Sequence, residues 1–148
     1  MRIHWLQTDI IWKDRLANHA HVSHLLEQIQ PNEVDMVVLP EMWNSGFCME
    51  PADLAESHEG ETWSWCLKQA QRLNALVLGS WVTTDSGLFY NRLHVAFPDG
   101  RHLHYNKRHL FAYAGEDQHY ASGREILDFV WKGFTIRPLV CFDLRFPV

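Results

Sequence analysis

Apolar residues recur along this chain with two different spacings, and each spacing predicts a different kind of element. Two sets of four apolar residues fall at i, i+3, i+4 and i+7: Val22, Leu25, Leu26 and Ile29, and then Trp63, Cys66, Leu67 and Ala70. This spacing places each set on one face of a helix. The pattern therefore predicts a first helix that begins near Asp14 and ends at Pro31, and a second helix over 61–74.

Short apolar stretches between and after these helices predict β-strands. They cover residues 3–8, 34–39, 75–82, 89–97, 101–106, 126–131 and 134–140. Runs without polar alternation, such as 34–39, are typical of strands covered on both faces. Turn residues at 83–87, 98–100 and 132–133 separate several of these strands, and the last two turns predict hairpins. The order β-α-β-α-β followed by hairpins predicts an α/β fold with a mixed sheet and flanking helices.

Three of the predicted strands end in side chains that can carry chemistry. Glu41 follows 34–39, Lys107 follows 101–106 and Cys141 follows 134–140. Open α/β sheets bind ligands outside the carboxyl ends of their strands, so these groups would form one constellation if the strands are neighbours. Each residue also has a plainer interpretation: a solvated carboxylate, a surface lysine and a small buried hydrophobe.

Composition narrows the class of protein. The 148 residues are 47% apolar and 21% charged, with a net charge of −5, which predicts one globular domain over 1–148 and no nucleic-acid or polybasic membrane surface. The sequence has no apolar run of the ~18 residues that span a bilayer and no signal-peptide pattern at residues 1–9. Three cysteines without a CxxC spacing favour reduced thiols and a cytoplasmic location.

The three chemical stretches resemble the nitrilase superfamily of carbon–nitrogen hydrolases. The resemblance rests on Leu-Pro-Glu-Met-Trp-Asn-Ser-Gly-Phe at 39–47, Tyr-Asn-Lys-Arg-His-Leu-Phe at 105–111 and Cys-Phe-Asp-Leu-Arg-Phe-Pro at 141–147. It runs over residues 2–148, and family members continue well past the position of Cys141. The resemblance implies an α-β-β-α sandwich, of which this chain would hold the N-terminal portion and lack the C-terminal part.

The resemblance also implies roles for the three residues. Cys141 would be the nucleophile, Glu41 the general base and Lys107 a fixed ammonium that stabilises the oxyanion. The backbone N–H of Phe142, which follows the nucleophile, would be the second oxyanion donor. No metal or organic cofactor is implied.

Further site residues follow from the resemblance, with alternatives. Glu116 would support the lysine and position substrate, and the adjacent Asp117 is its rival. Arg145 would meet a substrate carboxylate, or would form a structural salt bridge with Asp143.

The motifs are most similar to the omega-amidase branch of the family. The implied reaction is hydrolysis of the terminal amide of a small 2-oxo acid, such as 2-oxoglutaramate, through a cysteine thioester, by a homodimer of the longer parent protein. Another small amide or a nitrile is an alternative substrate. A different alternative is an inactive fragment or pseudo-enzyme that acts as a binding or interaction module.

Ten histidines raise two competing hypotheses. His21 and His24 share a helix face, and His102 and His104 share a strand face, so either pair could bind a metal. The sequence has no second cluster with ligand spacing, so a polar face is the favoured interpretation of His102 and His104. A cysteine–histidine hydrolase would pair Cys141 with one of these histidines.

Overall fold

The computed structural model describes residues 1–146, so Pro147, the last residue of the third motif, and Val148 lie outside the described residues. A five-stranded sheet with the strand order β1-β2-β3-β4-β5 forms its centre. The strands are β1 (Ile3–Trp5), β2 (Met36–Val38), β3 (Leu76–Asp85), β4 (Leu88–Ala96) and β5 (His102–Asn106). The first three strands are parallel and the last three antiparallel, which confirms the predicted mixed sheet.

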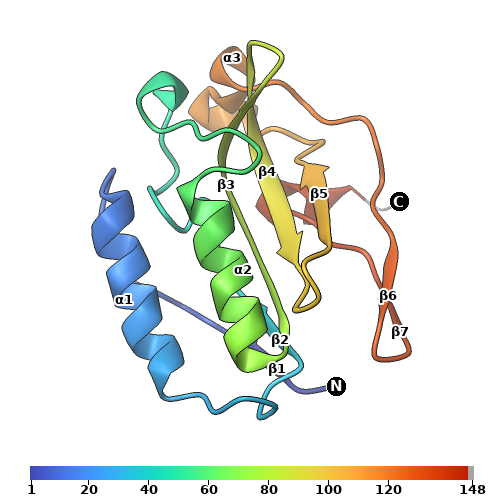
Figure 1. Cartoon of the computed structure of the whole chain (residues 1–148). Helices are drawn as coiled ribbons and strands as arrows, with labels where there is room; N and C mark the ends of the chain where they lie inside the picture. Colours follow the sequence, from blue (N-terminus) through green and yellow to red (C-terminus); the bar gives the residue numbers. More distant parts are fainter. Residues whose placement is uncertain (147–148) are drawn as a thin grey trace.

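Both predicted helices are present, and they lie side by side on one face of the sheet (Figure 1). Helix α1 (Arg15–Glu27) is capped by Asp14, whose carboxylate accepts a hydrogen bond from the Ala17 amide at 3.0 Å. Helix α2 (Glu61–Leu73) ends at Asn74 in the left-handed conformation, a common way to close a helix. Their apolar stripes pack with Val37, Val77 and Trp81 into one hydrophobic core.

The opposite face of the sheet carries a second core. It consists of alternate residues of β2–β5, together with residues of the chain that follows: Met36, Leu76, Leu78, Leu93, Val95, Phe97, Tyr105, Phe129 and Val140. After β5 come α3 (Glu116–His119) and a separate two-stranded antiparallel sheet of β6 (Phe129–Trp131) and β7 (Phe134–Ile136). The two cores are those expected when side chains alternate across a sheet.

Several predicted strand bounds were wrong: β1, β2 and β6 are shorter than predicted. The turn placed at 83–87 is shorter, because β3 continues to Asp85. More importantly, 134–140 is not a buried strand: β7 ends at Ile136 and is exposed or half-buried. Arg137 and Pro138 interrupt the run, and proline has no N–H to donate to a strand ladder. Cys141 therefore lies in a 3₁₀ helix, η3 (Cys141–Arg145), and not at the end of a strand.

A groove of about 570 Å³ runs between the second face of the sheet and residues 136–144, with a lining that is mostly apolar. At its rim Trp5 is 76% exposed and Leu144 74% exposed. Glu41 and Cys141 also line the groove. No helix within residues 1–146 has the length and apolar character to cross a membrane.

Candidate active site

Glu41 and Lys107 meet although their strands are not neighbours. Lys107 directly follows β5, whereas Glu41 follows β2, and β3 and β4 lie between these strands. The chain after β2 crosses over β3, because the Met42 amide donates to Ser80 Oγ at 3.0 Å and the Trp43 amide donates to Ser80 O at 3.2 Å. Met42 adopts a left-handed φ of 46° in this crossing. Glu41 therefore reaches past β3 to Asn91 on β4 and to Lys107.

Lys107 lies at the centre of a buried cluster of charges. Its Nζ is 2.8 Å from Glu41 Oε1 and 2.8 Å from Glu116 Oε2. The side chains of Lys107 and Glu116 are fully buried, and that of Glu41 is 20% exposed. Glu116 Oε2 also accepts the Phe111 amide at 2.6 Å. An ammonium has three donor hydrogens, so the two carboxylates leave one for another acceptor.

Asn91 connects the carboxylates of Glu41 and Glu116. Its Nδ2 donates to Glu41 Oε1 at 2.8 Å and to Glu116 Oε1 at 3.0 Å. Asn91 is fully buried on β4, and its own backbone carbonyl accepts the Lys107 amide at 3.0 Å. Asn91 therefore fixes the separation of both carboxylates and the start of the loop that carries the lysine.

The surroundings of Lys107 keep it charged. Burial by itself lowers the pKa of Lys107, but Glu41 and Glu116 outweigh it, so the pKa of Lys107 lies above its ordinary value. Its Nζ also lies 5.3 Å from the centre of the Phe47 ring, a favourable cation–π arrangement. Lys107 is thus a permanent cation with two anionic neighbours, which is a preorganised electrostatic site.

Cys141 lies at the end of the groove beside this cluster. It is an exposed free thiol, and its φ of 45° is unusual for a residue with a side chain. Burial of part of the residue and the negative charge of Glu41 raise the pKa of Cys141, while Lys107 opposes that rise. The thiol is therefore protonated at neutral pH, and Glu41 is the carboxylate that most strongly affects its pKa.

The Phe142 N–H is the backbone amide that directly follows the residue carrying the thiol. Phe142 is the second residue of η3, and the first amides of a helix have no acceptor within it. Its ring packs edge-on against Phe111 at 5.1 Å between centroids. This packing holds the residue beside the segment that leads from Lys107 to Glu116 at the start of α3.

Asp143 connects the 3₁₀ helix that contains Cys141 to the rest of the site through hydrogen bonds. Its carboxylate is buried and accepts hydrogen bonds from Tyr105 Oη at 2.8 Å, the His109 amide at 2.9 Å and the Val140 amide at 3.0 Å. His109 Nδ1 also lies 2.9 Å from Asp143 Oδ1. One carboxylate thus connects the turn of the thiol to β5 and to the residues just after Lys107.

The other predicted site residues are placed differently. Glu116, and not its exposed neighbour Asp117, contacts Lys107. Arg145 is exposed and is not among the residues that line the groove. Among residues 1–146 Asp143 forms no salt bridge with Arg145, so that alternative is wrong; Asp143 binds Tyr105, His109 and Val140 instead.

Neither proposed histidine pair forms a metal site by itself. His24 is exposed and pairs with Glu27 at 3.5 Å. His104 is exposed, but His102 is not part of a polar face: it stacks on Trp63 with ring centroids 3.6 Å apart. Within residues 1–146 no hydrogen bond joins Cys141 to a histidine.

Sequence reasoning missed Asn91 and gave Asp143 no more than a polar role. A signal for Asn91 was present, because it is a lone amide among the residues that become the buried half of a strand. Buried polar side chains need partners, so such a position is a candidate for a site residue. No comparable signal distinguishes Asp143 from the other acids of the chain.

Comparison with known proteins identifies relatives of this chain. The chain is 42% identical to the omega-amidase YafV of Yersinia enterocolitica and 30% identical to the 2-oxoglutaramate amidase of Bacillus subtilis. These alignments cover 100% and 96% of this chain, but 57% and 56% of the two relatives. The chain thus spans a little more than half the length of these curated relatives.

A crystal structure from Xanthomonas campestris is also similar. It is a member of the CN-hydrolase superfamily with an arsenic adduct in its active site, and it matches 99% of this chain and 55% of its own with a TM-score of 0.96 at 43% identity. The family model for carbon-nitrogen hydrolases matches residues 2–148. This chain belongs to the carbon–nitrogen hydrolase family.

Proposed function

We propose that the protein hydrolyses the terminal amide of a small 2-oxo acid, with Cys141 as nucleophile, Glu41 as general base and Lys107 as the fixed cation. One observation carries the proposal: Glu41 and Cys141 line the same groove, while Lys107 is held beside Glu41 by two carboxylates. The similarity to proteins named omega-amidase and 2-oxoglutaramate amidase supports the substrate class.

The first half of the reaction forms a thioester. Glu41 takes the proton of the Cys141 thiol, and the thiolate attacks the amide carbonyl carbon. The carbonyl oxygen becomes an oxyanion that accepts hydrogen bonds from the third Lys107 hydrogen and from the Phe142 N–H. The C–N bond then breaks, and the proton held by Glu41 moves to the leaving nitrogen, which departs as ammonia.

The second half releases the acid. Glu41 takes a proton from water, and the resulting hydroxide attacks the thioester carbonyl. The C–S bond breaks, the thiolate recovers its proton from Glu41, and the carboxylic acid leaves. The same two oxyanion donors serve both halves, and one such donor is worth about 3 kcal/mol of transition-state stabilisation.

Glu116 and Asn91 act through Lys107 and Glu41 in this scheme. Glu116 holds the ammonium from the side opposite Glu41. Because Asn91 and Lys107 both donate to Oε1 of Glu41, the oxygen that accepts the thiol proton is Oε2. Arg145 remains the proposed partner of the substrate carboxylate, and that role requires it to turn towards the groove.

The wider setting is part of the same proposal. Residues 1–148 are the N-terminal portion of a carbon–nitrogen hydrolase domain, consistent with the share of its relatives that the chain spans. The protein works in the cytoplasm, where its three free thiols stay reduced, and the longer parent protein is a homodimer.

The test combines hydrolysis with alkylation of Cys141. Release of ammonia from 2-oxoglutaramate is measured for the 148-residue chain without substitutions, called the parent chain below, and for the variants Glu41→Gln and Glu59→Gln. Glu59 is an exposed glutamate, so its variant is the matched control. Glu41→Gln should lower hydrolysis by about 10²–10⁴-fold. The same variant should alkylate with iodoacetamide at least as fast as the parent, because the Glu41 charge raises the pKa of Cys141.

Glu41→Gln should thus lower the rate of hydrolysis without lowering the rate of alkylation, and this pair of effects makes the proposal refutable. Selective labelling of Cys141 alone is not diagnostic, because Cys48 and Cys66 are buried and Cys141 is exposed. Full hydrolysis by Glu41→Gln would exclude Glu41 as the base. If the parent chain releases no ammonia from 2-oxoglutaramate but does so from another small amide or from a nitrile, the family chemistry stands and the substrate class is wrong.

A further inference from the structure

Three histidines converge on the face of the sheet that carries the helices. They are His58 in the turn before α2, His94 on β4 and His102 on β5, and one ring nitrogen of each lies within 4.8 Å of the others. Side chains alternate along β4, so His94 lies on the opposite face from Asn91. The cluster is therefore separate from Glu41, Lys107 and Cys141.

All three rings are neutral at neutral pH. Burial lowers the pKa of His58 and of His94, and it lowers that of His102 to about 3. Neutral imidazole is the form that binds metal ions. In the part of the chain that the structure describes, no hydrogen bond or ion pair joins any of the three to a carboxylate.

The orientation of two rings is already set. Thr83 Oγ1 lies 3.0 Å from His94 Nε2, and His94 Nδ1 lies 2.8 Å from His102 Nε2. Trp81 stacks on His94 at 3.8 Å between centroids, and Trp63 stacks on His102 at 3.6 Å. If the proton of His94 is on Nε2 and donates to Thr83, then Nδ1 accepts a hydrogen bond from His102 Nε2–H, and this proton must move to His102 Nδ1 before an ion can bind between the two nitrogens. A hydrogen bond such as that from His94 to Thr83 fixes metal-binding histidines in other proteins.

We propose that His58, His94 and His102 bind a divalent transition ion of the zinc type, with water in the fourth position. Zinc lies about 2.0–2.1 Å from imidazole nitrogens and prefers tetrahedral geometry, which separates the nitrogens by about 3.4 Å. The pair at 2.8 Å must therefore open slightly and His58 must approach. His58 can move, because it is half-buried in a turn.

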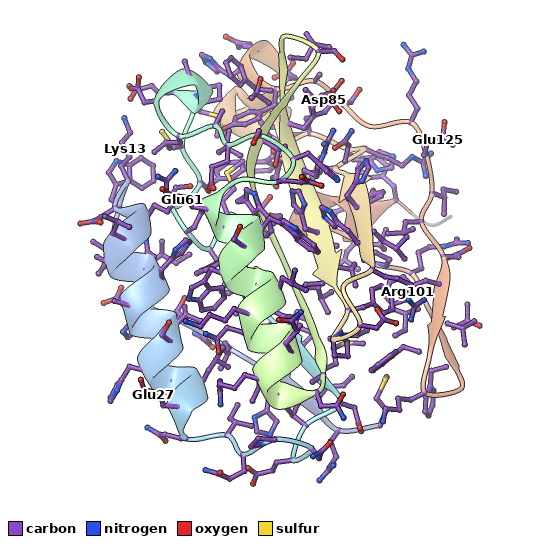
Figure 2. All side chains as sticks on the ribbon, in the orientation of Figure 1. Lys13, Glu27, Glu61, Asp85, Arg101 and Glu125 are labelled. Atoms are coloured by element: carbon purple, nitrogen blue, oxygen red, sulfur yellow. The ribbon has the colours of Figure 1, made fainter. Side chains whose placement is uncertain are left out.

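Arg92 is the main opposing charge. Its Nη1 lies 3.4 Å from His58 Nδ1, a long hydrogen bond that the bound ion would replace. The guanidinium keeps two shorter partners, Asp85 Oδ2 at 2.8 Å and Asn106 Oδ1 at 2.6 Å, and Asp85 offsets its charge. Figure 2 shows Asp85 at the end of β3, close to the turn into β4. The site therefore binds more weakly than one built from thiolates.

A bound ion would connect the turn before α2 to the β4–β5 hairpin. Because these segments are held together by stacking in the absence of metal, the ion should stabilise the folded chain and raise its melting temperature. This consequence is independent of amide hydrolysis. It can be measured on a chain whose nucleophile has been removed.

The test titrates Zn²⁺ into the metal-stripped 148-residue chain by calorimetry. A Cys141→Ser background removes the exposed thiol as a competing ligand. His58→Gln and His102→Gln are compared with His24→Gln, an exposed histidine of α1 that serves as matched control. The expected result is one bound ion, at least tenfold weaker binding in each of the first two variants, unchanged binding in the control, and a Zn²⁺-dependent rise in melting temperature that both variants lose.

Two results would overturn the proposal. One is the absence of Zn²⁺ binding to the folded parent chain. The other is binding that His58→Gln leaves unchanged. His58 is half-buried in a turn, and His58→Gln leaves the stacking of Trp81 on His94 and of Trp63 on His102 in place, so this comparison remains valid even if His102→Gln does not fold.

Discussion

Replacing Lys107 by methionine tests the charge cluster most directly. Methionine keeps most of the length of the lysine stem but removes the charge and all three donors. Glu41 Oε1 and Glu116 Oε2 each lose a hydrogen bond of 2.8 Å. Asn91 then remains as the connection between two carboxylates of like charge.

The expected cost in stability is large. Removing one partner of a buried ion pair costs about 3–5 kcal/mol, because the other charge is left uncompensated. The whole free energy of unfolding of a domain is about 5–15 kcal/mol. Since the pKa of Lys107 is raised in the folded chain, its contribution is fully present below its ordinary pKa of 10.5 and is lost only as the pH rises through the folded value. The deficit of the variant is thus complete at pH 7.

The expected effect on Cys141 has a definite sign. Lys107 lowers the pKa of the thiol and Glu41 raises it, so loss of Lys107 should move the pH midpoint of alkylation upwards. Hydrolysis of the amide should fall by about 10²–10³-fold through loss of one oxyanion donor. Glu41→Gln, in contrast, should move the alkylation midpoint downwards.

The measurements are urea unfolding at pH 7 and the pH profile of iodoacetamide labelling at Cys141. Lys68→Met, an exposed lysine of α2, is the matched control and should change neither quantity. If Lys107→Met unfolds at the same urea concentration as Lys68→Met and alkylates with the parent profile, the buried cluster does not exist as described, and the argument for Lys107 fails.

Three other outcomes follow from the structure. Asn91→Leu should lower the free energy of unfolding, measured with urea, by about 1–3 kcal/mol. It should also lower kcat with little change in KM, because the Asn91 amide contacts Glu41 and Glu116 but not the groove. A change confined to KM would contradict this. Asp143→Asn should cost about 2–4 kcal/mol, since three donors lose part of a charged acceptor, and an unchanged urea midpoint would refute the role of Asp143. Stability should fall as the pH drops from 6.5 towards 3, because the pKa values of His94 and His102 are lowered in the folded chain and the unfolded chain binds more protons; His102→Phe should flatten this dependence.

The two helices and the second strand were predictable because local sequence patterns determine them. The i, i+3, i+4, i+7 stripes around Val22 and Cys66 decide which face of each helix is buried, and both became part of one core. The run 34–39 has no polar alternation, which correctly indicated a strand with cover on both faces. These signals need no knowledge of distant residues.

Residues 134–140 show where local signals fail. The run is apolar enough for a strand, but a strand also needs partners for its amides, and Arg137-Pro138 removes that possibility in the described chain. The result is a 3₁₀ turn that places Cys141 at a positive φ. An apolar pattern reports the tendency to be buried, and it carries no information about the hydrogen bonds that a segment can find.

The candidate site was predictable in its residue types but not in its geometry. Glu41, Lys107 and Cys141 were expected to meet only if their strands were neighbours, yet β2 and β5 are separated by two strands. Glu41 reaches Lys107 through the loop after β2, in which Met42 and Trp43 form two hydrogen bonds to Ser80, 38 positions away in sequence from Met42. Asn91 is another such distant contact, since it donates a hydrogen bond to Glu41 from 50 positions away in sequence. The residues that hold a site together lie on other elements, so they become visible only when the sheet has assembled, and this is why the three chemical groups were identified before the amide that positions two carboxylates around the lysine.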